Sequence, residues 1–200
     1  GYTAMAGTAL ALVLLPACGT QLPAFMQPWH QIDTLALFYK GFALVITLLV
    51  LWLTLECAPY LTRFTLDGKL AEMFSLPLIV CAGMMWMASA RDLVTVFICL
   101  ELVTISFYVL VAFARKSALS LEAGVKYLIL GALSTGVLVY GIAWIYGATG
   151  SMNFDAIGKA LGNPATSKSA ALFGAAMLLV GLAFKVAAAR FHMCVPAGEQ

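Results

Sequence analysis

Six long apolar stretches constrain the fold of this chain more than any other feature of its sequence. Only six of the twenty charged residues fall inside them, and the other fourteen lie in the remaining 70 residues. A lipid bilayer imposes this segregation, because about 20 apolar residues are needed to cross about 30 Å of hydrocarbon. The sequence therefore predicts about six transmembrane segments, over residues 1–17, 34–57, 73–90, 93–114, 123–147 and 170–193.

The composition of these stretches favours helices over the strands of a membrane barrel. Only helices and closed barrels pair all their backbone groups within hydrocarbon. Barrel strands alternate polar and apolar residues, whereas these stretches are continuously apolar and rich in Leu, Ala, Met and Gly. With 63% hydrophobic and 10% charged residues, the chain is neither an ordinary soluble domain, nor disordered, nor a disulfide scaffold. We therefore predict an all-α fold, a polytopic membrane helix bundle.

Residues that end helices gather in the connections. Glycine and proline punctuate three of them, and charged residues fill the two shortest. In the last connection, Asn153 is placed to cap a short interfacial helix that runs to Leu161, with Asp155 near its positive end. The net charge of +2 is too small to indicate a nucleic-acid partner. The connections are 18–33, 58–72, Arg91-Asp92, a charged loop over 115–122, and 148–169.

The charges of these connections predict an orientation, because successive connections lie on opposite sides of a membrane. Connections 58–72 and 115–122 together carry four Lys or Arg residues, and the connections on the other side carry three over a longer length. The positive-inside rule therefore favours the first pair as cytoplasmic.

Small residues inside the stretches predict close helix packing rather than ligand binding. Gly131, Gly136 and Gly141 follow no strand and precede no Lys-Ser/Thr pair, so they do not form a phosphate-binding loop. The five cysteines show no CxxC pair and no histidine at metal-binding spacing, and we expect them to be buried apolar residues. The sequence thus predicts no metal site and no cofactor site. Because the chain opens on Gly1 rather than Met, we expect a fragment of a longer protein.

Charged residues deep inside the stretches are the candidate functional residues, because each costs at least about 2.5–3.5 kcal/mol at the centre of a bilayer. Glu101 is the ninth residue of its stretch, near mid-depth, and shares a helix face with Thr104 and Tyr108. Lys185 is the sixteenth residue of the last stretch, too deep to extend easily to the interface. Either residue can carry a proton during transport, or the two can form an ion pair that only locks helices together.

Two further residues have both a functional and a purely structural interpretation. Lys126 is the fourth residue of its stretch and can extend to the membrane rim, as we expect of Lys40, an anchor near a stretch end. His192 follows Lys185 by seven residues and is either a satisfied core histidine or a proton relay. An acid and two lysines on separate helices predict a carrier of protons or cations.

Several short motifs occur together between residues 91 and 193. The most specific is Ser-Leu-Glu-Ala-Gly-Val-Lys-Tyr at 120–127, preceded by Leu-Glu-Leu at 100–102 and followed by Tyr-Gly-Ala-Thr-Gly at 146–150. Gly-Leu-Ala-Phe-Lys at 181–185 and Phe-His-Met at 191–193 continue the pattern. In these motifs the chain resembles the subunit N family of NADH-quinone oxidoreductase (respiratory complex I), whose antiporter-like members are related to Mrp-type cation/proton antiporters.

The resemblance implies a fold and a set of functional residues. The family has about fourteen helices that include two inverted five-helix repeats, and this chain would hold the second to the seventh helix. Residues 1–72 would form peripheral N-terminal helices, and residues 73–200 the start of the first repeat. By motif, Glu101 matches the family's essential membrane glutamate, and Lys185 matches the lysine on its discontinuous helix.

The remaining matches are less complete. Lys126 matches the lysine of the 120–127 motif, and His192 matches the histidine of the Phe-His motif, with a lesser role. Arg190 stands where the family has the proline that helps to break the helix, and Cys194 stands where the family has tryptophan. The broken-helix geometry near Lys185 therefore depends on residues that depart from the family pattern.

The function that the resemblance implies is that of a membrane subunit of proton-pumping NADH:quinone oxidoreductase. Such a subunit translocates protons through a half-channel with its buried glutamate and lysines. It belongs to an enzyme but performs no redox chemistry itself, since NADH, flavin, iron–sulfur clusters and quinone are expected on partner subunits. Its partners would be other complex I membrane subunits and the lipid of a bacterial inner membrane, with quinone bound by the whole complex. Two alternatives stay open: an Mrp-type Na⁺/H⁺ antiporter subunit, and a non-transporting structural subunit.

Overall fold

The computed structural model describes residues 1–17, 26–62, 70–114, 116–164 and 166–185. Throughout this described part the only β pairing is two isolated bridges, so the all-helical prediction is confirmed. The helices are α1 (Tyr2–Leu14) with the short 3-10 helix η1 (Leu15–Ala17), α2 (Thr34–Leu61), α3 (Ala71–Met87), α4 (Leu93–Val111), α5 (Ala118–Thr149), α6 (Phe154–Leu161) and α7 (Lys168–Lys185).

Each of the six predicted stretches coincides with a helix. Four of them, α2, α4, α5 and α7, are long and apolar enough to cross a membrane. Helices α1 and α3 are shorter, with 13 and 17 residues, and a 17-residue helix extends about 25 Å. The predicted stretch 170–193 is described only as far as Lys185, so Arg190 and His192 lie outside the described residues.

Side chains cap the helices where the chain enters them. The Asp33 carboxylate accepts a hydrogen bond from the backbone of α2 at 2.7 Å, and the Asp92 carboxylate accepts one from the backbone of α4 at 2.6 Å. Asn153 caps α6 as predicted, because its Oδ1 accepts from the N–H groups of Asp155 and Ala156 at 3.0 and 3.4 Å. These caps set the start of the helix that carries Glu101 and of the interfacial helix.

Two of the predicted connections are wrong in their bounds. Ser117 caps α5 through the backbone of Ser120, so residues 118–122 form the first turns of a helix and not a charged loop. Helix α2 continues to Leu61 and includes Pro59, which was expected in a connection. A proline removes one backbone hydrogen bond from a helix, and Pro59 does so in the last turn of α2, close to where the helix ends.

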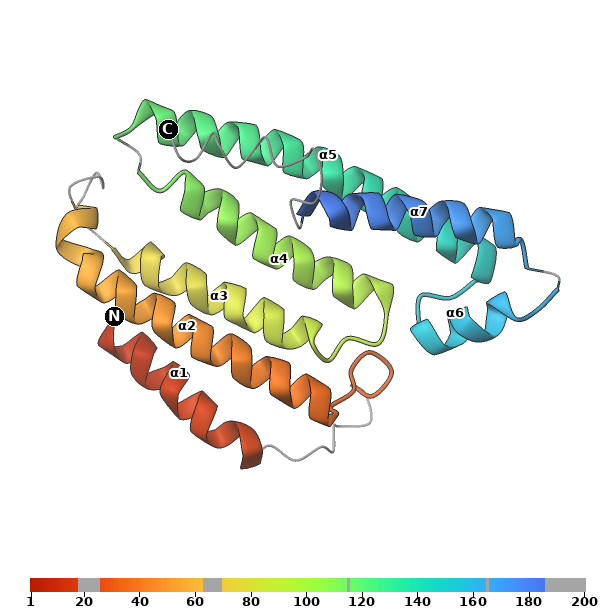
Figure 1. The fold of residues 1–200 in the computed structure, drawn as a ribbon, viewed down its shortest axis with the longest axis horizontal. Coiled ribbons are helices and arrows are strands. Elements are labelled where there is room, and N and C mark those ends of the chain that lie inside the picture. The colour runs from red at the N-terminus through yellow and green to blue at the C-terminus, as the bar shows by residue number, and fades with distance from the viewer. Residues whose placement is uncertain (18–25, 63–69, 115, 165, 186–200) are drawn as a thin grey trace.

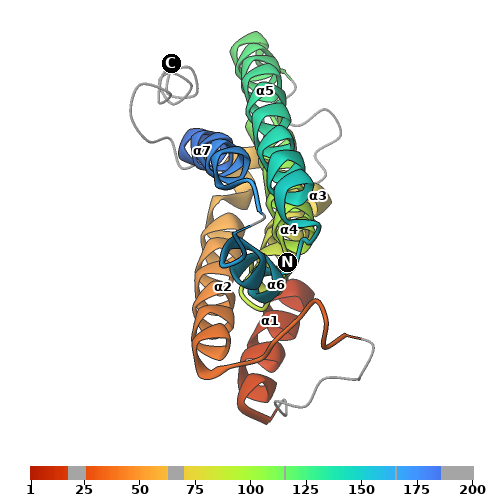
Figure 2. The same ribbon diagram turned by 90° about the vertical axis from the view of Figure 1, so that its right-hand side faces the viewer.

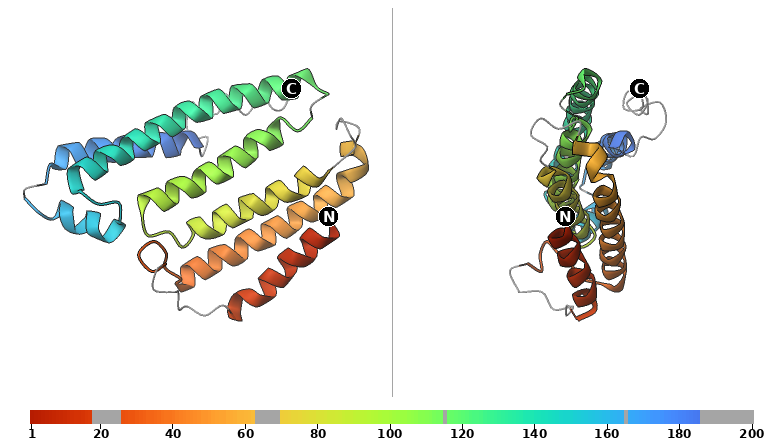
Figure 3. Two further views of the ribbon diagram at one scale, coloured as in Figure 1. Left: turned by 180° about the vertical axis from the view of Figure 1, so that it is seen from behind. Right: turned by 90° about the vertical axis from the view of Figure 1, so that its left-hand side faces the viewer.

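Helices α1 to α5 lie side by side in chain order, and each runs antiparallel to the next (Figure 1). Helix α7 packs along α5 in the most extensive contact between two described helices (Figure 2). Seen from behind, the end of α2 and the start of α3 lie at the same end of the row as the α4–α5 connection (Figure 3). The α3–α4 and α5–α6 connections lie at the opposite end, as the alternation of connections predicts.

At that opposite end the loops are tied together by their backbones. The loop before α2 bonds to the α3–α4 turn through Gln31 N–H, which donates to the Ser89 carbonyl at 2.9 Å. The same turn bonds to the loop before α6 through Leu93 N–H, which donates to the Met152 carbonyl at 3.0 Å. The start of α4 is therefore held from two sides, and this fixes the helix that carries Glu101.

Several hydroxyl side chains are buried in the bundle, and many large apolar side chains are exposed. Thr47, Thr54 and Ser106 are buried, and their hydroxyls donate to carbonyls four residues earlier at 2.8, 2.8 and 2.9 Å. Phe38 and Leu133, in contrast, are 66% and 67% exposed. Large apolar side chains on the outside and self-satisfied hydroxyls on the inside fit a bundle surrounded by lipid and further helices.

Glycines bring α5 and α7 together backbone to backbone. A Cβ atom on Gly141 would lie 2.7 Å from the Gly174 carbonyl oxygen, and one on Gly174 would lie 2.8 Å from the Gly141 carbonyl oxygen. Two turns further along α7, a Cβ on Gly181 would lie 2.7 Å from the Cβ of Leu138. Helix α7 therefore follows α5 at a separation that only glycine permits, and this places Lys185 close to α5.

The glycine predictions are confirmed at two of three positions. Gly141 lies at the α5–α7 crossing, and a Cβ on Gly131 would overlap the hydroxyl of Tyr108 on α4. Gly136 has open space around it within the described chain, so no described residue supports its predicted role in packing. It lies five residues from each of the other two, and therefore about 140° around the helix from either.

We expect Gly141→Ala to destabilise the protein and Gly136→Ala to leave it unchanged or slightly more stable. The added methyl group at Gly141 meets backbone atoms that cannot move aside, which costs about 1–3 kcal/mol. At Gly136 the methyl group meets no described atom, and alanine favours a helix by about 1 kcal/mol over glycine. Thermal unfolding of the detergent-solubilised, full-length protein measures both, and equal melting temperatures would contradict the packing of α7 on α5.

Candidate functional site

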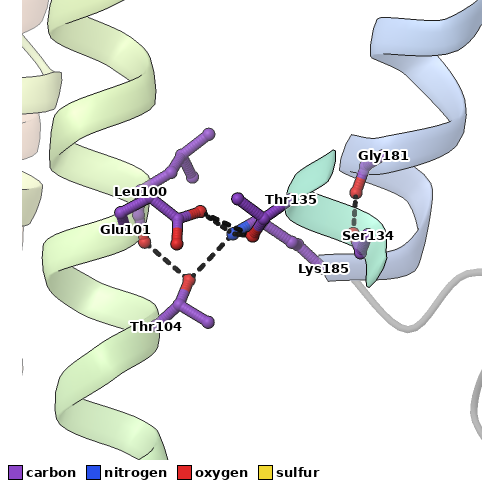
Figure 4. A network of polar contacts seen from close by, with 7 residues as sticks. All are labelled: Leu100, Glu101, Thr104, Ser134, Thr135, Gly181 and Lys185. Atoms are coloured by element: carbon purple, nitrogen blue, oxygen red, sulfur yellow. Dashed lines mark hydrogen bonds and ion pairs between the residues drawn. The ribbon is translucent and has the colours of Figure 1, made fainter. Parts of the chain in front are cut away.

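The two predicted intramembrane charges meet in the structure. Glu101 lies midway along α4, Lys185 ends the described part of α7, and Glu101 Oε1 and Lys185 Nζ are 2.6 Å apart (Figure 4). Only 9% of the lysine side chain and 21% of the glutamate side chain are exposed. This contact is required by both interpretations of the sequence, the proton carrier and the helix-locking ion pair.

Two threonine hydroxyls complete the surroundings of the lysine ammonium group. Thr104 Oγ1 of α4 lies 3.1 Å from Lys185 Nζ, and Thr135 Oγ1 of α5 lies 3.4 Å from it. An ammonium group has three N–H donors, so the two hydroxyls and the carboxylate give each donor an oxygen acceptor. Thr135 also donates to Glu101 Oε1 at 2.9 Å. Side chains from three helices therefore converge on one largely buried pair of charges.

Sequence reasoning missed the contribution of α5 to this site. Ser134 and Thr135 are adjacent hydroxyl residues in the middle of an otherwise apolar stretch, and that position was the available signal. Ser134 Oγ donates to the Gly181 carbonyl oxygen of α7 at 3.0 Å, one turn before Lys185 (Figure 4). This bond and the glycine packing on α5 set the position of the lysine relative to α4.

A cavity of about 680 Å³ lies beside the pair, between α3, α4 and α5. Glu101, Thr135 and Tyr108 line it together with Glu72 at the start of α3, and most of the remaining wall is apolar. The predicted face of Glu101, Thr104 and Tyr108 is thus divided, because Thr104 turns to the lysine and Tyr108 to the cavity. The Tyr108 hydroxyl is buried and has no hydrogen-bond partner in the described part of the chain.

Of the other two predicted site residues, Lys126 is described and is not brought to this pair. Lys126 Nζ forms an ion pair with Glu122 Oε1 at 2.6 Å, and both side chains are 58% exposed. It lies nine residues before Thr135 on α5, about 13 Å along the helix axis. This position agrees with the interpretation of Lys126 as a residue at the rim, and its role stays a prediction. His192 lies outside the described residues.

The chain matches a sequence model of the NADH:quinone oxidoreductase/Mrp antiporter transmembrane family over residues 90–200, more than half of its length. The chain belongs to this family. The matched region includes Glu101, Thr135 and Lys185, and therefore the whole of the three-helix site. The resemblance read from the motifs is confirmed, and so is the expectation of an antiporter-like membrane fold.

Curated relatives and solved structures agree with this membership. NADH-quinone oxidoreductase subunit N of Desulfitobacterium hafniense is 41% identical over 173 residues, which cover 86% of this chain and 34% of the relative. Subunit N 2 of Roseiflexus castenholzii is 38% identical over 200 residues, which cover 98% of this chain and 39% of the relative. A chain of respiratory complex I from Thermus thermophilus, solved with bound aureothin, superimposes with a TM-score of 0.71 at 31% identity.

The chain covers only part of each protein that it matches. The superposition on the Thermus thermophilus chain covers 98% of this chain and 40% of that one. A membrane-bound sulfane sulfur reductase superimposes with a TM-score of 0.77 at 22% identity, which shows a shared fold alone. The chain thus spans between a third and two-fifths of the length of these proteins, and it is a multi-pass membrane protein with the helices of one part of their fold.

We expect Glu101 and Lys185 to be strongly coupled in stability. Glu101→Gln or Lys185→Met alone leaves one buried charge without its partner, which costs about 3–5 kcal/mol. The double variant removes both charges, so it should be more stable than either single variant. Thermal unfolding of the four proteins in one detergent gives the coupling energy. Glu122→Gln, which breaks the exposed pair with Lys126, is the matched control and should leave the melting temperature unchanged.

Proposed function

We propose that the protein is a membrane subunit of a proton-pumping NADH:quinone oxidoreductase and that its Glu101–Lys185 pair takes part in proton translocation. The observation that carries the proposal is a contact between a carboxylate midway along the apolar helix α4 and an ammonium at the end of the described part of α7, with the carboxylate lining a cavity. Family membership and the subunit N relatives support the same assignment.

The geometry suits a charge-coupled proton site. In contact, the two charges neutralise each other and the three donors of the ammonium are satisfied. If Glu101 moves away, Lys185 becomes an isolated ammonium in a medium of low dielectric constant, which costs several kcal/mol. Release of the proton removes that cost. Opening and closing of one ion pair therefore converts a small displacement of α4 or α7 into the loss and capture of a proton.

The driving energy would come from outside this chain. In the proposed assembly, NADH, flavin, iron–sulfur clusters and quinone belong to partner subunits, and the chain contacts other membrane subunits of the complex and lipid. Quinone reduction then changes the Glu101–Lys185 contact through charge and conformational coupling. We propose that the protein lies in the inner membrane of a bacterium, because the relatives named above are bacterial proteins. Lys126 and His192 remain further proposed residues of the same half-channel.

We expect Glu101→Gln and Lys185→Met, each introduced into the full-length subunit, to lower NADH-driven proton pumping by about tenfold or more, because one variant abolishes the carboxylate and the other the titratable ammonium. The measurement is acidification of inside-out membrane vesicles per NADH oxidised, with assembly of the complex verified on native gels. Lys159→Met, at an exposed lysine of α6, is the matched charge control. An unchanged ratio of protons to NADH in both site variants would refute the assignment.

The same vesicles separate the two other functions. The matched family includes Mrp antiporters, and a subunit of that type would acidify or alkalinise vesicles in response to a sodium gradient without NADH. A purely structural pair would tolerate Glu101→Leu combined with Lys185→Met, since buried pairs are often replaceable by apolar residues. Normal pumping in that double variant would favour the structural function.

A further inference from the structure

We propose that Thr135 is a positioning residue that holds the Glu101 carboxylate against Lys185 and so links the ion pair to α5. This inference rests on the proposed function for its consequences in pumping, but the hydrogen bond on which it depends is measurable without it. Thr135 lies neither on the helix of the glutamate nor on that of the lysine, and it contacts both side chains (Figure 4).

The direction of the Thr135 hydroxyl sets it apart from the threonines in the middle of α2 and from Thr104 of α4. A threonine in an apolar helix ordinarily donates its single proton to the carbonyl four residues earlier. Thr47, Thr54 and Thr104 do so, at 2.8, 2.8 and 2.6 Å. Thr135 donates instead to Glu101 Oε1, on another helix, at 2.9 Å. Its hydroxyl therefore stabilises the site rather than its own helix.

Each hydrogen-bond donor of Lys185, Thr104 and Thr135 at the site has an acceptor. The hydroxyl protons of Thr104 and Thr135 are committed to the Leu100 carbonyl and to Glu101, so their lone pairs are free to accept from Lys185. Thr135 and Lys185 bond to the same carboxylate oxygen, Oε1. Loss of the Thr135 hydroxyl removes one donor from the carboxylate and one acceptor from the ammonium, whereas loss of the Thr104 hydroxyl leaves the carboxylate untouched.

Two adjacent residues of α5 hold the two helices of the pair. Ser134 bonds to the Gly181 carbonyl of α7, and Thr135 bonds to Glu101 of α4. A rotation or shift of α5 therefore changes the distance between the charges. Thr135 and Glu101 also line the cavity, and Lys185 does not. The Thr135 hydroxyl thus lies between the cavity and the lysine. From there it sets how the Glu101 carboxylate is oriented toward the cavity.

The test compares four variants of the full-length subunit in the assembled complex. Thr135→Val keeps the shape of the side chain and removes the hydroxyl, and Thr135→Ser keeps the hydroxyl. Ser134→Ala removes the neighbouring interhelical bond, and Thr54→Val removes a buried hydroxyl that bonds only to its own helix. A hydrogen bond to a charged group is stronger than one between neutral groups, so Thr135→Val should lower vesicle acidification per NADH by about tenfold. Thr135→Ser should retain most of it, and Thr54→Val should pump normally.

An infrared measurement tests the hydrogen bond independently of pumping. The carboxylate band of Glu101, assigned by its loss in Glu101→Gln, should shift in Thr135→Val and keep its position in Thr135→Ser and Thr54→Val. If Thr135→Val does not assemble, Thr135→Cys replaces it, because a thiol of similar size is a weak donor. An unshifted band together with normal pumping in the variant that lacks the hydroxyl overturns the proposal.

The two proposals can fail separately. If Glu101→Gln pumps normally, the proposed function fails, while the band shift in Thr135→Val still tests the positioning of the carboxylate. If Glu101→Gln abolishes pumping but Thr135→Val neither shifts the band nor lowers acidification, the function stands and the role of Thr135 is refuted. A fall in pumping that Thr135→Ser does not rescue also refutes it, since the hydroxyl would not be the cause.

Discussion

A buried ion pair in a medium of low dielectric constant is the interaction on which the rest of this structure depends. A lone charge at the centre of a bilayer costs at least about 2.5–3.5 kcal/mol, so neither Glu101 nor Lys185 is tolerable there without the other. Their contact at 2.6 Å requires that α4 and α7 present these residues at the same depth. Packing between helices and the cap at the start of α4 hold α4 and α7 at that relative depth.

Close packing along α5 provides much of this precision. Gly141, Gly174 and Gly181 let the backbones of α5 and α7 come into close contact. Ser134 adds a hydrogen bond between the same two helices. At the other end of α4, the Asp92 cap and the backbone bonds of the neighbouring loops hold the start of the helix. The hydroxyls of Thr47, Thr54 and Ser106 satisfy their own helices, whereas the Thr135 hydroxyl donates to Glu101 on another helix.

The sequence predicts much of this fold for a physical reason. Continuous apolar stretches, capping residues and Gly-Pro connections are local signals, and they located the helices, the α6 cap at Asn153 and the two charges that need each other. The misplaced start of α5 is also local, because the charged residues of 115–122 mask the cap at Ser117. In contrast, Thr135 and the vacant surroundings of Gly136 depend on how α5 is rotated against α4 and α7. That rotation is a property of packing, and a continuously apolar helix carries little pattern that would reveal it.

Lys126 and Lys185 also show that sequence motifs alone do not predict which residue a charge will contact. Both lie in apolar stretches and both match family motifs, yet Lys185 meets Glu101 while Lys126 pairs with Glu122 on an exposed turn of its own helix. Depth in the stretch distinguishes them: Lys185 is far from either end of its predicted stretch, and Lys126 is near the start. The less exposed lysine is the one whose charged partner comes from another helix.

The most direct test of the central claim is an electron cryomicroscopy structure of the full-length protein in its native membrane assembly, at a resolution that shows side chains. The ion-pair interpretation predicts Glu101 Oε1 within hydrogen-bonding distance of Lys185 Nζ, with the Thr135 hydroxyl beside both. A Glu101 side chain that points toward lipid acyl chains, away from Lys185, would contradict it and would leave only the family membership standing.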